Sequence, residues 1–437
     1  MFMTFGMFIL LIALVLFGVL AFKQLNALLL APIVTIFVLV CSGLPILEGL
    51  KTNFIKESAN YVTNYFFVFF TGALFGAVYQ FTGAAVAVAK LISKLLHGKF
   101  VAPVIMIITG VLTYGGISGF VVFFCIYPIA LQLFRENNMS RMLIPAAISA
   151  GTWTWSMTGP GSPSIQNVTA MTNLGTPASA AFTPSLIITI IEFVLIFVWL
   201  EYRARWHMKK GNYFDDPRLK PLDPEELKAD DVDVPNGILS LLPIVLILVC
   251  FNGFDIPVEA AVMYGTILAM IMFWRRVGGG KVSSWVEVFN KGAANGGVAI
   301  LNTAIVVGFA GVVKNTPAFS ELVERLLQSN MSPYWFVAIT VAVAAGAAGS
   351  ASGGMAAAFS ALKDTYIGLG ANLEYVHRIS AIAAGTLDTL PHQGAQITLL
   401  SLCKMTHKDS YFDIFVTQLA IPIIIVAIFI PLAQLGM

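Results

Sequence analysis

The sequence predicts an all-α polytopic membrane protein built from two inverted repeats, each with five transmembrane crossings and one re-entrant hairpin, and with broken helices at the membrane midplane. Three observations carry this prediction. Of the 437 residues, 58% are hydrophobic and 11% are charged, and apolar runs close to the roughly 20 residues that cross a bilayer recur along the chain. The only long hydrophilic stretch, residues 205–236, lies near the middle. The two halves on either side of it resemble each other.

The composition excludes several other classes. The first apolar run, residues 7–22, has no basic region before it and no small-residue cleavage site, so we expect a retained span rather than a signal peptide. The net charge of +2 gives no sign of a nucleic-acid partner. The four cysteines have no metal-ligand spacing. We therefore expect no cofactor and no bound metal, and the lipid bilayer as the main surroundings.

A constant offset of 234 positions relates the two halves. It aligns "IPAAISAGT" (residues 144–152) with "RISAIAAGT" (residues 378–386), and "GGISG" (residues 115–119) with "GSASG" (residues 349–353). Membrane transporters are often built from duplicated units of this kind. The offset therefore predicts an internal duplication.

Residues 1–204 form the first predicted repeat. Its ordinary spans are expected at residues 6–22, 26–44, 61–83 and 183–202. An amphipathic segment at 84–99 suits a helix in the membrane interface. Residues 100–134 would make one helix of about 52 Å, longer than a hydrocarbon core of about 30 Å, and three central glycines interrupt them, so we expect a hairpin there. A broken helix is expected over 141–172, with its break at "TWSMTGPGSPS" (residues 154–164).

Residues 237–437 form the second predicted repeat. We expect spans at 237–252, 257–274, 292–313 and 411–432, a hairpin at 333–362 and a broken helix at 376–402. Five crossings per repeat give the two repeats opposite orientations. Under this topology most of the 25 lysines and arginines share one side, as is typical of cytoplasmic loops. We therefore expect a multi-pass protein of the cell (inner) membrane of a bacterium, with a cytoplasmic, solvent-exposed linker and both termini outside.

The four breaks supply the candidate substrate site. Non-helical backbone at membrane depth persists only where protein or a water-filled cavity satisfies it, and each new half-helix offers free N–H groups to an anion. Ser118 and Ser352 are expected to cap the second hairpin arms, and Ser162 the second part of the first broken helix. The alternative is that these hydroxyls bond to the preceding helical turn. The candidate substrate-binding residues are Gly116, Ser118, Gly119, Thr154, Ser156, Thr158, Ser162, Ser350, Ser352, Gly353, Thr389, His392 and Gln393.

Asp388 and His392 are the candidates for ion coupling. A carboxylate at membrane depth costs about 2.5–3.5 kcal/mol even on permissive scales, and such residues in transporters are often functional. An ionised Asp388 would repel an anion, whereas a protonated one could donate a hydrogen bond to it, which predicts proton symport. The alternatives are a structural pair that locks the break, or a sodium ion near Ser118 and Ser352. Glu192 lies in a span without a break, so we expect a scaffold hydrogen bond or a subunit contact.

Three segments resemble the gluconate permease (GntP) family, and most closely its branch of hydroxybutyrate and other short hydroxy-acid permeases. They are "TNLGTPASAAFTPSL" (residues 172–186), "HRISAIAAGTLDTLPHQGAQITLL" (residues 377–400) and "MTHKDSYFDIF" (residues 405–415). The resemblance implies the ion-transporter superfamily fold, a homodimer and an elevator-type mechanism. It also implies proton-coupled uptake of a small hydroxy-monocarboxylate such as 3-hydroxybutyrate. A gluconate, sugar-acid or citrate-like substrate and sodium coupling stay open as alternatives.

The sequence leaves two other functional classes as alternatives. "GISG" (residues 116–119) matches the GxSG of rhomboid intramembrane proteases, with Ser118 and His392 as the pair. Four residues are a weak motif, however, and a protease has no use for a repeated "SASG" (residues 350–353) or a second broken helix. A channel is the second alternative. We expect a carrier and not an enzyme.

Overall fold

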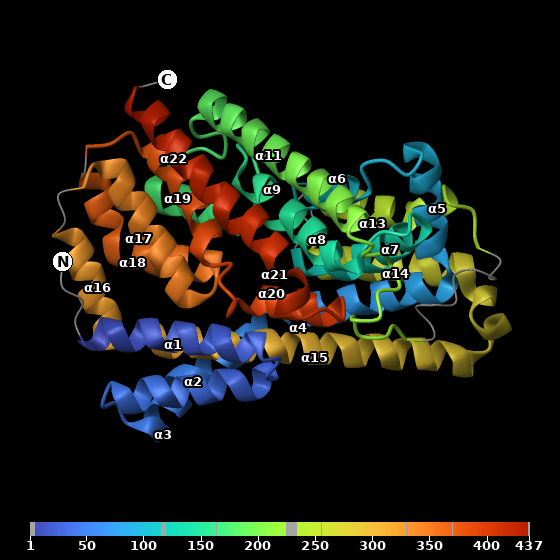
Figure 1. Ribbon diagram of the computed structural model, residues 1–437, viewed down its shortest axis with the longest axis horizontal. Coiled ribbons are helices and arrows are strands. Elements are labelled where there is room, and N and C mark those ends of the chain that lie inside the picture. Colours follow the sequence, from blue (N-terminus) through green and yellow to red (C-terminus); the bar gives the residue numbers. More distant parts are fainter. Residues whose placement is uncertain are drawn as a thin grey trace.

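The computed structural model describes residues 5–114, 119–162, 164–223, 234–254, 256–328, 331–368 and 370–435, and these residues are helical without strands (Figure 1). Seven helical segments in this part of the chain are long and apolar enough to cross a membrane. They are Phe5–Phe22, Ile46–Thr82, Gly119–Glu136, Phe182–Lys209, Val258–Arg276, Val282–Lys314 and His407–Gln434. The predicted fold class, an all-α polytopic membrane protein, is confirmed.

The first half contains the helices up to the linker. They are α1 (Phe5–Phe22), α2 (Ala27–Cys41), α3 (Ile46–Gly49), η1 (Leu50–Ile55), α4 (Lys56–Thr82), α5 (Ala84–Leu96), α6 (Val101–Tyr114), α7 (Gly119–Glu136), η2 (Arg141–Leu143), α8 (Ile144–Trp153), α9 (Trp155–Thr158), α10 (Ile165–Leu174) and α11 (Phe182–Lys209). The third helical segment begins at Ile46, well before the predicted residue 61, because its polar first turns continue the helix. Helix α11 likewise extends into the predicted linker.

The second half follows the linker. Its helices are η3 (Leu239–Leu241), α13 (Leu242–Phe254), α14 (Val258–Phe273), η4 (Trp274–Arg276), η5 (Gly278–Gly280), α15 (Val282–Lys314), α16 (Pro317–Leu327), α17 (Pro333–Ala348), α18 (Ala351–Gly368), α19 (Leu373–Leu387), α20 (Gly394–Leu402), α21 (His407–Phe415), η6 (Val416–Ala420) and α22 (Ile421–Gln434). Helix α15 begins ten residues before the predicted span at 292, again through polar residues.

Local sequence sets several of these boundaries. Gly83, with φ of 76°, ends α4 in the left-handed conformation that glycine adopts without strain. Asn372 begins α19, since its side chain accepts a hydrogen bond from the Glu374 amide at 2.9 Å. Thr406 and Asp409 form a capping box that begins α21.

The two halves pack according to the same plan. Helix α1 packs on α2 as α13 packs on α14, α2 packs on α15 as α14 packs on α4, and α6 packs on α8 as α17 packs on α19. Helices α4 and α15 make the most extensive contact between the halves. Figure 1 places α5 and α16, which follow α4 and α15, at opposite ends of the molecule, and both ends of the described chain at one of them. Equivalent helix contacts therefore recur in the two halves of the chain.

Small residues allow the central helices to approach closely. A Cβ at Gly76 of α4 would lie 2.5 Å from the Phe124 carbonyl oxygen of α7. A Cβ at Gly292 of α15 would lie 2.9 Å from a methyl carbon of Leu74. Close backbone approach is a common basis of helix packing in membranes. The centre of the fold therefore depends on glycine at both positions.

Many residues in the described part of the linker are exposed, and a few of its side chains pack against the helices. Phe214 and Leu219 are buried. Arg141, also buried, donates hydrogen bonds to the carbonyl oxygens of Phe214 and Lys220, each at 3.1 Å. The topology prediction treats Arg141 and Arg378 as loop residues, but both side chains are buried. Buried guanidinium groups do not report on the side of the membrane, so only the remaining cations bear on it.

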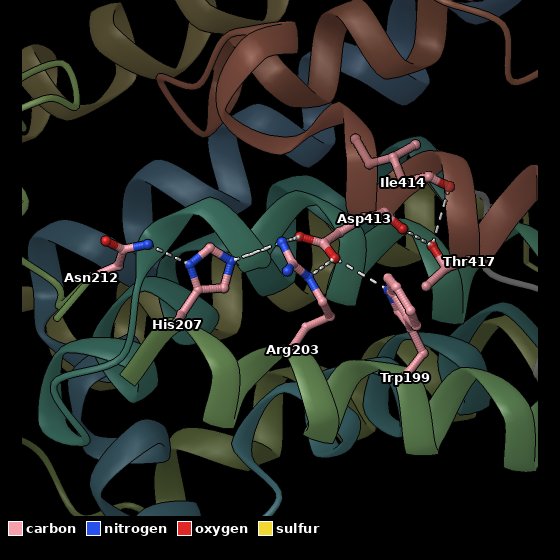
Figure 2. A network of polar contacts seen from close by, with 7 residues as sticks. All are labelled: Trp199, Arg203, His207, Asn212, Asp413, Ile414 and Thr417. Atoms are coloured by element: carbon pink, nitrogen blue, oxygen red, sulfur yellow. Dashed lines mark hydrogen bonds and ion pairs between the residues drawn. The ribbon is translucent and has the colours of Figure 1, made fainter. Parts of the chain in front are cut away.

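A buried ion pair joins α11 to α21 (Figure 2). Arg203 Nε lies 2.5 Å from Asp413 Oδ1, and Arg203 Nη2 lies 3.1 Å from Asp413 Oδ2. The indole of Trp199 donates to Asp413 Oδ1 at 3.2 Å, and the His207 ring lies between Arg203 and Asn212. Because the guanidinium and the carboxylate are both well shielded from solvent, this pair fixes the last span of the first half against the last span of the second.

Candidate functional site

A cavity of about 320 Å³ lies between the two halves, where both breaks and the second hairpin tip meet. Five residues predicted from the sequence line it: Gly119, Ser350, Ser352, Asp388 and Gln393. Its aromatic wall consists of Tyr61, Tyr65, Phe120 and Trp153. Among its described lining residues there is one carboxyl group, Asp388, and no lysine, arginine or histidine.

The second hairpin tip is shaped by glycine and serine. Helix α17 ends at Gly349, which has φ of 55° and where a Cβ would lie 2.8 Å from His392 Cδ2. Ser350 caps α18, because its hydroxyl accepts a hydrogen bond from the Gly353 amide at 3.2 Å. The expected cap, Ser352, is instead in the first turn of α18, with its hydroxyl 3.4 Å from that of Ser350. The helix begins slightly earlier than the sequence motif suggested.

Asp388 lies in the second break, between α19 and α20, and is 5% exposed. Its Oδ2 accepts a hydrogen bond from Gln393 Nε2 at 2.7 Å, and its Oδ1 accepts one from the Thr389 hydroxyl at 3.3 Å. The backbone amide of Ala351, at the start of α18, lies near this carboxyl group. Neutral donors and the amino-terminal end of a helix therefore hold Asp388.

His392 does not line this cavity. Its Nε2 lies 2.8 Å from the Gly346 carbonyl oxygen in α17, and its ring contacts Phe17 and Phe309 edge-on, with centroids 5.7 and 6.2 Å apart. The structure thus separates the two candidates for ion coupling. Asp388 faces the cavity, whereas His392 holds the hairpin against the break from behind.

The hydroxyls of the first break bond within their own helical turns. Thr154 donates to the carbonyl four residues earlier, and Ser156 to the one five residues earlier at 2.5 Å. Thr158 donates to the Thr154 carbonyl at 3.2 Å and contacts Glu192 Oε2 at 3.3 Å. These three residues match the alternative of back-bonding to the preceding turn. Glu192 itself makes the hydrogen bond expected of a scaffold residue.

Other predicted residues lie elsewhere. The cap of α10 is Ser164 rather than Ser162, since Ser164 Oγ accepts from the Asn167 amide at 3.4 Å. Ser162 Oγ accepts a hydrogen bond from the Ser164 amide at 3.3 Å. Gly353 lines a neighbouring cavity. Gly116 and Ser118 lie outside the described residues. Their predicted roles, and the pairing of Ser118 with His392 expected for a protease, therefore stay predictions.

Three polar atoms in or beside the lining have no hydrogen-bond partner in the described part of the chain. Thr113 Oγ1, Gln166 Oε1 and Gln393 Oε1 are all buried. A buried polar group without a partner is costly, so these three atoms are candidates for contact with a ligand or with water. Gln166 and Thr113 were missed in the sequence, because a single polar residue in an apolar helix gives no distinct signal.

Arg378 was also missed as part of the site's framework. It is fully buried in α19 and donates to the carbonyl oxygens of Ala178, Ala180, Thr158 and Gly159. It also donates to an Asn167 side-chain oxygen at 2.8 Å. Its position in the repeat offered a signal, because the aligned residue of the first half is Ile144. Arg378 therefore orders the first break from the second half of the chain.

Comparisons with known proteins identify relatives over most of the chain. Residues 40–364 match the model of the DcuC family, described as C4-dicarboxylate anaerobic carrier. "Uncharacterized transporter YxjC" of Bacillus subtilis is 32% identical over 453 residues, covering 94% of this chain and 95% of that protein. An "Uncharacterized transporter" of Haemophilus influenzae is 23% identical over 328 residues, covering 74% and 73%. The prediction of a transporter rather than an enzyme is confirmed.

The family match corrects the resemblance to the gluconate permease family, which was wrong. That resemblance rested on three segments, two of which lie beyond residue 364, whereas the family model matches a continuous stretch of more than half the chain. The elevator-type mechanism and the homodimer followed from the resemblance and stay untested predictions. The chain belongs to the DcuC family, described as the C4-dicarboxylate anaerobic carriers.

Proposed function

We propose that this carboxylate transporter is a proton-coupled symporter for a small hydroxy-monocarboxylate of the size of 3-hydroxybutyrate, bound in the cavity beside Asp388. The observation that carries the proposal is the charge of the lining. Its described residues include one carboxyl group and no cationic side chain. The duplicated packing of the helices supports two inverted repeats, with the cavity between them.

The charge of the lining favours a monoanion. Removing an ion from water costs several kcal/mol in effective terms, and this cost must be offset by opposite charge or by hydrogen bonds. A single carboxylate can be bound by hydroxyls, amides and the start of α18. A dianion would bring a second unpaired charge close to Asp388. The unpartnered oxygens of Gln166 and Gln393 suit the hydroxyl group of a hydroxy acid, which would donate to them.

A C4-dicarboxylate is the second candidate, and the family description favours it. The matched residues end at 364, however, before α19. The second break, with Asp388 and Gln393, therefore lies outside the part of the chain that carries the family match. The substrate of this chain is decided in part by residues that the family description does not cover.

Proton coupling follows from the surroundings of Asp388. A proton on Asp388 would convert a carboxylate that repels the substrate into a hydrogen-bond donor to it. Loss of that proton on the other side of the membrane would release the substrate. Sodium coupling is the alternative, with hydroxyl and carbonyl ligands at the second hairpin tip near Ser352.

Uptake into proteoliposomes tests the proposal. With an acidic exterior and no sodium, the wild type should accumulate labelled 3-hydroxybutyrate, and an excess of unlabelled 3-hydroxybutyrate should compete better than succinate. A proton ionophore should abolish the accumulation. Uptake that requires sodium and ignores the pH gradient would exclude proton coupling, and stronger competition by succinate would favour the dicarboxylate.

A further inference from the structure

A second cavity, of about 300 Å³, adjoins the first. The two share lining residues Tyr61, Tyr65, Val307, Ser350 and Ser352. Its remaining wall comes from the start of α4, the end of α15, and helices α16, α17 and α18. We call this second cavity the vestibule. Because α15 ends beside α16, the vestibule lies toward the end of the molecule that also holds both ends of the described chain (Figure 1).

The vestibule differs from the inner cavity in charge. Lys314, the last residue of α15, is the one cation among the described lining residues of the two cavities. Its Nζ lies 2.7 Å from Oε1 of Glu57, in the first turn of α4. The side chain of Lys314 is 41% exposed and that of Glu57 is 29% exposed. The carboxylate of Glu57 therefore already pairs with the ammonium group of Lys314, and solvent reaches both groups.

We propose that the vestibule is a second, outer binding site for the transported carboxylate, in which Lys314 exchanges Glu57 for the substrate before the substrate enters the inner cavity. An exposed ion pair is worth only about 0–1 kcal/mol, so exchange of one carboxylate for another at Lys314 has little net cost. Asn60 and Asn64 of α4 and the hydroxyls of Ser350 and Ser352 supply further polar contacts. The inference rests on the proposed function only in that the cargo is a small carboxylate.

The shared tyrosines connect the two sites. The rings of Tyr61 and Tyr65 lie with their centroids 4.6 Å apart, tilted by 35°, and line both cavities. Phe120 lies 6.4 Å from each ring and lines the inner cavity. The substrate would thus meet a cation first and Asp388 second. Capture of the anion and its protonation-dependent binding become separate steps at separate places.

Kinetics of variants test the vestibule site. Lys314→Gln should raise the KM for 3-hydroxybutyrate uptake roughly tenfold at low ionic strength with little change in kcat, and the difference should shrink in high salt. Glu57→Gln should lower the KM, because it removes the competing carboxylate. Lys56→Gln is the matched control, since this exposed lysine precedes Glu57 in α4 and does not line the vestibule. An unchanged KM in both Lys314→Gln and Glu57→Gln would overturn the inference. An equal loss of kcat and of thermal stability in both variants would also overturn it, because it would show that the ion pair only stabilises the fold.

A labelling experiment separates this inference from the proposed substrate. A cysteine introduced as Asn60→Cys in the vestibule lining, in a background lacking the four native cysteines, should react with a negatively charged methanethiosulfonate. External 3-hydroxybutyrate or succinate should slow this reaction while Lys314 is present, and Lys314→Gln in the same background should abolish the protection. Protection by both anions with uptake of succinate alone would sustain the vestibule but contradict the proposed substrate. Gradient-driven uptake that depends on Asp388, without protection of Asn60→Cys and without a KM effect of Lys314→Gln, would contradict the vestibule alone.

Discussion

Gln393 Nε2 donates a hydrogen bond to Asp388 Oδ2 at 2.7 Å across the second break, while the side-chain oxygen Oε1 of Gln393 has no partner in the described structure. One residue therefore fixes the carboxyl group and presents an acceptor at the cavity. The pair lies beside the start of α18, where the Ala351 amide lies near the Asp388 carboxyl group. The second break and the second hairpin tip thus form a single unit around one acid.

Replacing Gln393 tests this unit. Gln393→Ala removes both the donor to Asp388 and the free acceptor, so we expect the KM for 3-hydroxybutyrate uptake to rise roughly tenfold or more, the cost of one or two hydrogen bonds to charged groups. Gln396→Ala is the matched control. Gln396 is buried in α20, which begins just after Gln393, and its side chain donates a hydrogen bond to Gln418 and does not line the cavity. Equal effects of the two substitutions on KM would contradict the assigned role of Gln393.

Gly349 should tolerate no side chain. Gly349→Ala places a methyl group 2.8 Å from His392 Cδ2 at a backbone φ of 55°, so it combines left-handed strain of about 1–2 kcal/mol with a steric clash. The thermal midpoint of the purified protein should fall, and uptake with it. Gly43→Ala carries the same kind of strain at φ of 65° with nothing within 4 Å of its Cβ. A Gly349→Ala protein no less stable than Gly43→Ala would show that His392 does not hold the tip.

The ion pair of Arg203 and Asp413 should contribute strongly to stability. Asp413→Asn leaves a buried guanidinium without its partner, and breaking a buried pair in this way costs about 3–5 kcal/mol. The comparison is Glu201→Gln, which removes the exposed pair with Arg205 on the same helix, worth about 0.3–0.5 kcal/mol. Thermal unfolding of both variants measures the difference. Equal shifts in the midpoint would mean that the network in Figure 2 does not anchor α11.

The attachment of the linker should depend on pH in a defined direction. The hydrogen bond from Lys404, aided by the nearby Lys291, holds the pKa of Asp223 below its ordinary value, against the opposing effect of partial burial. A lowered folded-state pKa stabilises the protein above the unfolded value of about 3.9, and this contribution is lost as pH falls through the folded value. Wild type should therefore be more stable than Asp223→Asn from pH 7 down to about pH 4, and the difference should disappear in stronger acid. If the stability difference between wild type and Asp223→Asn instead grows below pH 4, the ion pair of Asp223 with Lys404 does not stabilise the linker in the proposed way.

The sequence predicted the helical fold and part of the site because those features depend on local composition. Apolar runs, glycine breaks and one acid in an apolar stretch sufficed to find Asp388, Gln393 and the second hairpin tip. The choice between Ser350 and Ser352 as cap failed because both lie in "SASG" and only the actual start of α18 separates them.

Other features depend on contacts between distant segments. His392 turns toward Gly346 of α17, and Arg378 reaches carbonyls about 200 positions earlier in the chain, so neither orientation is encoded in a local pattern. Gln166 and Thr113 become recognisable only when the cavity leaves their oxygens without partners. The short motifs pointed to the wrong family for a related reason, since they sample only a small part of the chain.

In the proposed function, Asp388 carries the coupled proton. The most direct measurement compares counterflow with gradient-driven accumulation for Asp388→Asn in proteoliposomes, because asparagine keeps a neutral hydrogen-bond donor but cannot release a proton. We predict that the variant retains exchange of labelled 3-hydroxybutyrate against an internal pool and loses accumulation driven by a pH gradient. Retention of pH-driven accumulation by Asp388→Asn would contradict proton coupling through Asp388.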